Sequence, residues 1–228
     1  MSQRIDPIRA VAFDLDGTLV DSAPDIAAAV NAMLGGLGYA SLPQRRIESM
    51  IGDGVDRLVA RALDEAAGSH AQGDATHAID AFRSHYARHL FERSRLYPGV
   101  PEGLRELAAG GIALCVVTNK ASAFARPLLG AAGIADMFEL VLCADRPEDR
   151  KPSPNLLIAA AAQLEVPPQE LLYVGDSRVD VAAARAAGCP VVVVDYGYDS
   201  PSAVDDAGHS VGSLCEIVAL SVPRRVTC

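Results

Sequence analysis

The sequence has little positive charge, and it has no uncharged stretch long enough to span a bilayer. Its formal net charge is −9 over 228 residues, and no cluster of basic residues offsets this excess. An acidic surface of this kind disfavours nucleic acid or a membrane as the partner. Asp14 and Asp16 interrupt the first apolar run, so we expect no signal peptide. An anionic substrate must therefore be held by local positive charge.

Paired cysteine motifs are also missing. The five cysteines are scattered along the chain, and no two of them are spaced as a metal-binding or redox pair. Cys115, Cys143 and Cys189 lie in apolar runs, so we expect them to be small buried side chains. This usage fits a reducing compartment, and we expect a cytoplasmic protein. The sequence does not distinguish a monomer from a homodimer.

Short apolar runs recur along the chain, and helical patterns lie between the later ones. The runs with the continuous apolar character of doubly covered strands are residues 10–14, 112–118, 139–143, 171–175 and 190–195. Helices are expected at residues 101–109, 122–132, 154–164 and 177–188, the last with Gly188 as its C-terminal cap. This alternation predicts an α/β fold: a Rossmann-like, three-layer core with a mainly parallel sheet.

The segment from residue 21 to residue 95 breaks the alternation, because it holds no strand-like run. Apolar residues recur at helical spacing in residues 26–37 and 55–63, and a third helix is expected at 75–93. We therefore predict two domains. Residues 1–20 and 96–228 form the α/β core, and residues 21–95 form an inserted all-helical domain.

Polar residues follow four of the predicted strands, at the end of a parallel sheet where ligands bind. In chain order these are Asp14 and Asp16, then Thr118, Asn119 and Lys120, then Lys151, and finally Asp176 and Asp180. Residues two apart in an extended backbone point to the same side, so Asp14 and Asp16 can face one cavity. With Asp176 they form a group of carboxylates that repel one another, and a hard divalent cation such as Mg²⁺ relieves this repulsion.

These groups suit a phosphoryl-transfer centre. A carboxylate can attack phosphorus to form an aspartyl-phosphate, while Lys151 and Thr118 can bind the phosphate oxygens. Asp16 is the candidate that protonates the leaving oxygen and later deprotonates a water molecule. Asp180 can hold metal-bound waters; the alternative is that it is only an acid at a helix N-terminus.

The strings DLDGTLVDS, VVTNK, RKPSP and VGDSRVD closely resemble the four motifs of the haloacid dehalogenase superfamily, in the expected order and spacing. The resemblance implies that Asp14 is the nucleophile, Asp16 the general acid and base, and Thr118 and Lys151 the phosphate-binding residues. It also implies that Asp14, the backbone carbonyl of Asp16, and Asp176 hold Mg²⁺. The inserted domain then corresponds to that superfamily's helical cap of the first type (C1).

Asp16 favours a phosphate ester as the substrate, because the dehalogenases of this superfamily lack an acid at that position. The related phosphonatases use a lysine of the cap, and the predicted cap contains none. The strings MIGDGVDRLVARAL, VTNKASAFARPLL and DYGY resemble bacterial phosphoglycolate phosphatases. This resemblance implies a Mg²⁺-dependent phosphomonoester hydrolase that converts 2-phosphoglycolate to glycolate and phosphate.

Such a substrate carries a carboxylate near its phosphate, so a second positive group is expected. Gly54 lies in the GDG loop, Arg57 follows that loop and Lys120 lies on the core side, so these three residues are candidates for substrate binding. Asn119 is a further candidate. The alternatives are that Arg57 is a solvated helix residue and that Asn119 belongs to a turn.

Other functions fit the same motifs. A phosphatase for a sugar phosphate, an amino-sugar phosphate or pyrophosphate would share the active centre, as would a phosphomutase resembling β-phosphoglucomutase. Receiver domains of signalling proteins also carry an aspartate and a lysine on a parallel sheet, but they are about half this length and need no equivalent of Asp16. A non-catalytic scaffold is disfavoured because all the motif residues are present.

Overall fold

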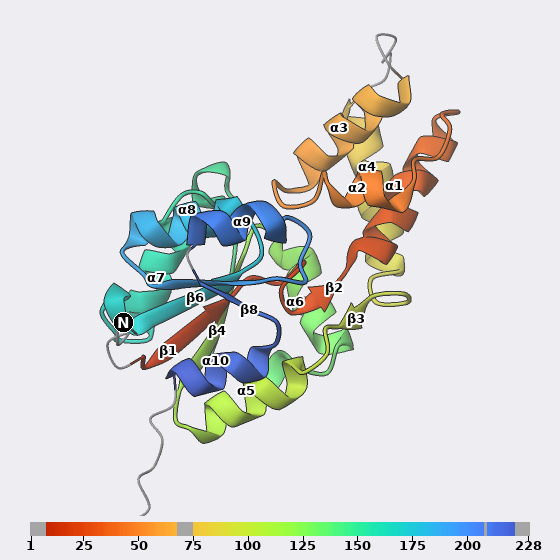
Figure 1. Ribbon diagram of the computed structural model, residues 1–228. Coiled ribbons are helices and arrows are strands. Elements are labelled where there is room, and N and C mark those ends of the chain that lie inside the picture. The colour runs from red at the N-terminus through yellow and green to blue at the C-terminus, as the bar shows by residue number, and fades with distance from the viewer. Residues whose placement is uncertain (1–7, 68–74, 208, 222–228) are drawn as a thin grey trace, which may run out of the picture.

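The structure, a computed structural model, describes residues 8–67, 75–207 and 209–221 (Figure 1). The parts of the two predicted domains at residues 1–7, 68–74, 208 and 222–228 lie outside the described residues. A six-stranded sheet has the order β5-β4-β1-β6-β7-β8, and all its neighbouring strands are parallel. Its strands are β1 (Ala10–Phe13), β4 (Ala113–Thr118), β5 (Leu140–Cys143), β6 (Leu171–Gly175), β7 (Val191–Val194) and β8 (Ser210–Val211).

Strand β1 lies in the middle of the sheet, and its two faces pack into two different apolar layers. Val11 and Phe13 belong to one cluster of buried side chains, and Ala10 and Ala12 belong to the other. This is the two-residue alternation of an extended chain, and it explains why the AVAF run has no polar residue. Phe13 pairs with Val116 of β4 and with Val174 of β6, so the three central strands end close to the same level.

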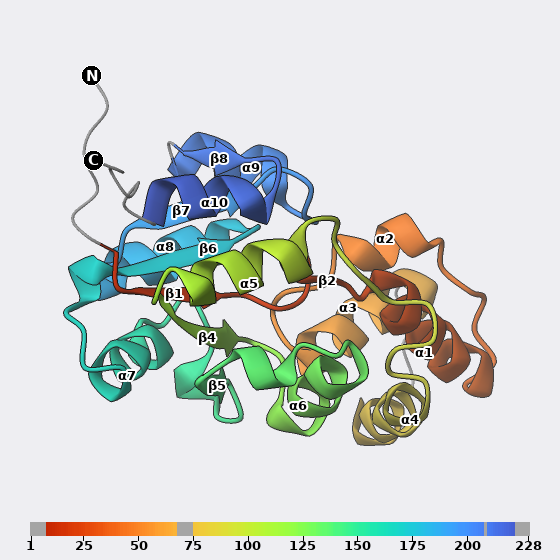
Figure 2. The same cartoon turned by 90° about the horizontal axis from the view of Figure 1, so that it is seen from below.

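Helices cover both faces of the sheet and complete the three layers (Figures 1 and 2). One face carries α5 (Val100–Ala109), α6 (Ser122–Ala131) and α10 (Leu214–Ser221). The other carries α7 (Asn155–Gln163), α8 (Arg178–Ala187) and α9 (Ser200–Ala207). Short 3₁₀ helices lie at Ala135–Met137, Pro147–Asp149 and Pro168–Glu170. The prediction of an α/β fold with a mainly parallel sheet is confirmed.

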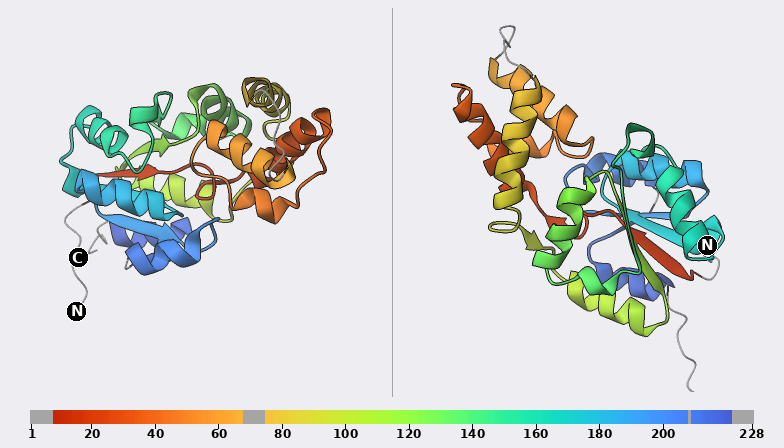
Figure 3. Two further views of the ribbon diagram at one scale, coloured as in Figure 1. Left: turned by 90° about the horizontal axis from the view of Figure 1, so that it is seen from above. Right: turned by 180° about the vertical axis from the view of Figure 1, so that it is seen from behind.

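Among the described residues, the four helices between β2 and β3 form a separate group beside one edge of the core (Figure 3). They are α1 (Ala23–Gly36), α2 (Gln44–Glu48), α3 (Val55–Ala67) and α4 (Ala75–Arg88), and we call them the helical insert. They pack around an apolar cluster of their own, to which the core contributes Phe124. The chain enters and leaves the insert through an antiparallel pair, β2 (Val20–Asp21) and β3 (Arg95–Leu96). The predicted domain boundaries at residues 21 and 96 fall on this pair.

Two details of the insert differ from the sequence prediction. Helix α4 ends at Arg88, whereas the spacing predicted a helix to residue 93. The buried Asp25 carboxylate accepts the backbone N–H groups of Arg93 and Ser94, so these residues lie outside the helix. Helix α2 was not predicted, because five residues are too few to show a period. No helix in the described ranges is both long and apolar enough to cross a bilayer.

Candidate active site

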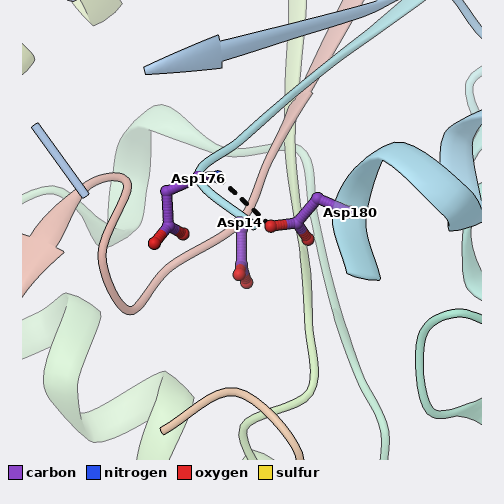
Figure 4. Close-up of side chains that lie close together, drawn as sticks. All are labelled: Asp14, Asp176 and Asp180. Carbon is purple, nitrogen blue, oxygen red and sulfur yellow. Dashed lines mark hydrogen bonds between the residues drawn. The ribbon is translucent and has the colours of Figure 1, made fainter. Parts of the chain in front are cut away.

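Three carboxylates from different segments meet at the carboxyl ends of β1 and β6. Asp14 follows the last residue of β1, Asp176 follows the last residue of β6, and Asp180 lies in the first turn of α8. One oxygen of each lies within 4.8 Å of the others, and Figure 4 shows the three side chains gathered at this edge. We call this group the acid cluster.

Asp180 owes its position to the way helix α8 begins. Its Oδ2 accepts hydrogen bonds from the backbone N–H and the hydroxyl of Ser177, at 3.0 and 2.6 Å, in a reciprocal capping box. The same oxygen accepts the backbone N–H of Asp176 at 3.2 Å. A Cβ atom on Gly175 would lie 2.5 Å from the Asp180 Cγ, so only glycine lets the helix start this close to β6. Asp180 therefore both caps helix α8 and belongs to the acid cluster.

Asp176 is held between two glycines. A Cβ atom on Gly17 would lie 2.4 Å from its Oδ2, and one on Gly197 would lie 2.2 Å from its Cβ. Gly17 also has a φ of +84°, in the left-handed region that glycine tolerates best. Thr18 donates its hydroxyl to Oδ1 at 3.1 Å, and the backbone N–H of Tyr198 donates to Oδ2 at 2.8 Å. The carboxylate is thus fixed from both sides.

Lys151 supplies the positive charge of the acid cluster. Its ammonium lies 2.9 Å from Asp14 Oδ1 and 2.6 Å from Asp180 Oδ1, and it donates to the Tyr173 hydroxyl at 2.8 Å. Burial opposes the charge of this side chain, but the two carboxylates raise the pKa of Lys151 above its ordinary value. Lys151 therefore stays an ammonium, and its three donors orient Asp14 against Asp180.

One ammonium does not balance three carboxylates. Burial raises the pKa of Asp14 to about 6, and the charge of the nearby Asp180 adds to this effect, although Lys151 partly offsets it. Burial and the charges of Asp180 and Asp14 raise the pKa of Asp176 well above its ordinary value. Asp180 is the exception: burial opposes its ionisation, but Lys151 and the hydrogen bonds from Ser177 lower its pKa. The excess of buried negative charge and the oxygen ligands are what a metal ion requires.

Asp16 is not a member of the acid cluster, and its carboxylate has other partners. Lys120 donates to both of its oxygens, at 2.9 and 3.0 Å, and the Ser22 hydroxyl donates to Oδ1. Burial opposes the charge of Lys120, but Asp16 raises the pKa of the ammonium. The ammonium also lies 4.7 Å from the centre of the Tyr86 ring in α4. Lys120 therefore connects the core to the helical insert.

Asn119 holds two loops together at the end of β4. Its side-chain N–H groups donate to the carbonyl oxygens of Gly52 and Lys151, at 2.8 and 3.2 Å, and its Oδ1 accepts the Lys151 backbone N–H at 2.7 Å. Thr118 is buried beside it, and its hydroxyl oxygen accepts the Lys120 backbone N–H at 3.1 Å. The Thr118 hydroxyl hydrogen is left for another acceptor.

A pocket lies between the carboxyl edge of the sheet and the helical insert. Its core wall includes Asp14, Asp16, Thr118, Asn119 and Lys120. The wall formed by the helical insert is mainly apolar and includes Ile26 of α1, Leu58 of α3 and Phe82 of α4. The site is thus one polar wall that faces one apolar wall.

Comparison with known proteins agrees with this geometry. The family model described as haloacid dehalogenase-like hydrolase matches residues 11–194. The chain belongs to this family. The superfamily predicted from the motifs is therefore confirmed.

Similar proteins cover nearly the whole chain. A phosphoglycolate phosphatase of Nitrosospira multiformis is 46% identical over 194 residues, which are 85% of this chain and 86% of that protein. One from Thiobacillus denitrificans is 44% identical over 96% of this chain and 97% of its own length. The crystal structure of a predicted phosphoglycolate phosphatase from Haemophilus somnus has a TM-score of 0.89 and 32% identity, over 94% of this chain and 98% of that one.

Most of the residues predicted from the haloacid dehalogenase motifs lie at this site, but they divide into two groups. Lys151 lies with the acid cluster, and the residues of the core wall named above line the pocket, as does Gly54 of the insert. Arg57 is exposed and is not among the pocket-lining residues, so this placement does not support it as a substrate ligand. Asn119 makes the contacts of a turn residue and also lines the pocket.

Tyr173, Tyr198 and Arg150 are among the described residues of the site that the sequence did not single out. The Tyr173 hydroxyl donates to Asp180 at 3.0 Å, the backbone N–H of Tyr198 donates to Asp176, and Arg150 lines the pocket. The Tyr198 hydroxyl also accepts the backbone N–H groups of Ser22 and Ala23, where helix α1 begins. Arg150 lies in the string RKPSP and Tyr198 in the string DYGY, both of which carried the resemblance, but the strings do not indicate which side chains contact the site.

Proposed function

We propose that the protein is a phosphomonoester hydrolase that converts 2-phosphoglycolate and water to glycolate and phosphate. The observation that carries the proposal is the acid cluster with Lys151 at the end of β1, next to a pocket that Asp16 and Thr118 also line. The choice of substrate is supported by relatives named phosphoglycolate phosphatase, which are 40–46% identical to this chain. The free thiols of Cys115, Cys143, Cys189 and Cys215 agree with a cytoplasmic location.

Asp14 and Asp176 are the carboxylates that would hold a Mg²⁺ ion, together with the backbone carbonyl of Asp16. Both carboxyl groups have raised pKa values, which reflects buried charge without enough compensation. Both oxygens of Asp180 are already engaged by protein donors, so this residue contributes charge and position. A bound Mg²⁺ ion would offset the repulsion between the Asp14 carboxylate and the phosphate dianion.

Asp14 is the nucleophile. One of its oxygens attacks phosphorus, the bond between phosphorus and the ester oxygen breaks, and an aspartyl-phosphate forms. For this step Asp16 must carry a proton; it gives that proton to the leaving oxygen, which departs as the hydroxyl group of glycolate. Asp16 then accepts a proton from water, whose oxygen attacks phosphorus and releases phosphate and the Asp14 carboxylate. The hydrogen bonds from Lys120 and Ser22 fix the Asp16 carboxylate for both transfers.

Lys151 and Thr118 bind the phosphate. The ammonium of Lys151 already contacts Asp14, so a phosphate on Asp14 lies within its reach after one hydrogen bond is exchanged. The Thr118 hydroxyl hydrogen is free to be donated to a phosphate oxygen, because its oxygen is held by the Lys120 backbone. Both interactions stabilise charge that spreads over the equatorial oxygens in the transition state.

A panel of phosphate esters tests the proposal. We expect kcat/KM at saturating Mg²⁺ to be at least about tenfold higher for 2-phosphoglycolate than for sugar phosphates, amino-sugar phosphates or pyrophosphate. Phosphate should be released without any added sugar bisphosphate, which distinguishes a hydrolase from a phosphomutase. A higher kcat/KM for another ester would overturn the assignment of the substrate, and release of phosphate only with a sugar bisphosphate would overturn that of a hydrolase.

A further inference from the structure

One arginine of the pocket has a buried hydrogen-bond donor without a partner. Arg150 immediately precedes Lys151 and lines the pocket. Its side chain is 27% exposed, yet its Nε atom is buried and has no hydrogen-bond partner in the part of the chain that the structure describes. A buried N–H of a charged group is costly when it is left unpaired. The protein keeps such a donor at the wall of its candidate active site.

The other end of this guanidinium is fixed by the helical insert. Arg150 donates from Nη2 to Oδ2 of Asp56, at 3.1 Å. A Cβ atom on Gly54 would lie 3.4 Å from the Arg150 Cζ and 3.5 Å from its Nε, and Gly54 lines the same pocket. The loop before α3 therefore lies against the guanidinium and holds it at the wall of the pocket.

The other positive groups near the pocket are less suited to a second anion. Lys120 already donates to both oxygens of Asp16. Arg83 also lines the pocket and contacts Asp56 at 3.4 Å, but its side chain is 50% exposed. Two arginines share the single carboxylate of Asp56, so this group of three carries one formal positive charge in excess. A second carboxylate would neutralise it.

We propose that Arg150 binds the carboxylate of the substrate, with the Nε–H as a donor and Asp56 as the residue that positions the guanidinium. This inference rests on the proposed function, because it assigns the group that reads the carboxylate of 2-phosphoglycolate. The planar fork of an arginine matches the two oxygens of a carboxylate. Arg150 is then the specificity-determining residue, while Lys151 beside it serves the phosphate that every substrate shares.

The test compares two esters that differ in the carboxylate. Ethyl phosphate has the two-carbon chain of 2-phosphoglycolate without the acid. For Arg150→Gln we expect kcat/KM for 2-phosphoglycolate to fall about 30-fold, mainly through KM, because a charged hydrogen bond is lost. The kcat/KM for ethyl phosphate should change little. The variant Arg150→Lys keeps the positive charge but lacks the planar guanidinium. It should recover only part of the preference for 2-phosphoglycolate over ethyl phosphate.

The matched control is Arg83→Gln, because Arg83 is the other arginine that pairs with Asp56. An exposed pair contributes little, so we expect the preference for 2-phosphoglycolate to stay within about threefold. If Arg150→Gln lowers kcat/KM equally for both esters, or if it leaves the preference intact, the role of Arg150 is refuted while the proposed function stands. If the unmodified protein shows no preference between the two esters, the proposed substrate fails and the Arg150 inference fails with it.

Discussion

The core wall and the insert wall of the pocket hold their polar side chains in different ways. Next to the core wall, in the acid cluster, Asp176 is buried and accepts hydrogen bonds from a hydroxyl and a backbone N–H of two segments, and the neighbouring Lys151 contacts three partners. In the insert wall, apolar side chains dominate, and the Asp56 side chain is 45% exposed. The comparison teaches that the reacting groups are fixed by the sheet, whereas recognition depends on how the insert meets the core.

Within the described residues, three polar contacts join the two walls. The Asn119 side chain donates to the Gly52 carbonyl, Arg150 pairs with Asp56, and the Lys120 ammonium lies over the Tyr86 ring. Each uses a core residue that lies within two positions of Thr118 or Lys151, the phosphate-binding residues. We therefore expect changes in the core wall to affect every substrate, and changes in the contacts between the walls to affect the choice among substrates.

Removal of the divalent cation should have the largest effect, because the reaction of every ester depends on the carboxylates that hold this ion. We expect a chelator to abolish turnover of all esters, and added Mg²⁺ to restore it. The pKa values of Asp14, at about 6, and of Asp176 lie above their ordinary value in the folded protein without metal. The stability that Asp14 contributes is therefore fully present at low pH and is lost as the pH rises through about 6, and the contribution of Asp176 changes in the same direction.

Mg²⁺ should accordingly raise Tm more at pH 8 than at pH 5, as differential scanning fluorimetry can measure. The same scan with Na⁺ at equal ionic strength controls for screening. Undiminished hydrolysis in the chelator, or an equal Tm shift at both pH values, would contradict a cation bound among these carboxylates.

The variant Asp16→Ala should affect substrates differently, according to how much their leaving group needs a proton. Loss of a general acid should lower kcat about 1,000-fold for 2-phosphoglycolate, whose leaving group needs a proton. Turnover of p-nitrophenyl phosphate should fall much less, since its leaving group is stable as an anion. Steady-state kinetics with both esters checks this, and equal losses would remove the acid role from Asp16.

The variant Gly197→Ala should have a moderate effect, limited to the acid cluster. The new Cβ would lie 2.2 Å from the Cβ of Asp176, so the carboxylate must shift. We expect affinity for Mg²⁺ to weaken about tenfold, as for other changes that displace a metal ligand. The matched control is Gly35→Ala in α1, where a Cβ meets nothing within 4 Å. An unchanged metal titration for Gly197→Ala would mean that Asp176 is not a ligand.

Arg57→Gln should have the smallest effect. The sequence offered this residue as one candidate for a substrate ligand, with a solvated helix residue as the alternative, and its side chain is exposed and lies outside the pocket lining. We expect kcat/KM for 2-phosphoglycolate to change less than about threefold. A fall as large as that expected for Arg150→Gln would restore Arg57 as the residue that recognises the carboxylate.

The core wall could be predicted from the sequence because its positions follow from local rules. Continuous apolar runs marked β1 and β6, and parallel strands of one sheet end at one edge, so Asp14 and Asp176 had to meet. The acid in the first turn of α8 was visible as well. Its capping box with Ser177 was not identified, although a serine three residues before an aspartate is a local signal.

The contacts between the walls could not be predicted, because they join residues far apart in the chain. Arg150 and Asp56 are separated by 94 residues, and no periodic pattern pairs them. The early end of α4 has the same cause, since Asp25 binds a backbone segment 68 residues away. Long-range pairs of this kind depend on tertiary packing, which overrides local propensity.

The most direct test of the account is to trap the phosphate on Asp14. The protein is mixed with 2-phosphoglycolate and Mg²⁺, the reaction is quenched with acid within the first turnover, and the peptides are examined by mass spectrometry. We predict a transient phosphate adduct on the peptide that contains Asp14, and no adduct or turnover in Asp14→Asn. A phosphate adduct on another residue, or normal turnover by Asp14→Asn, would contradict the central claim that Asp14 is the nucleophile.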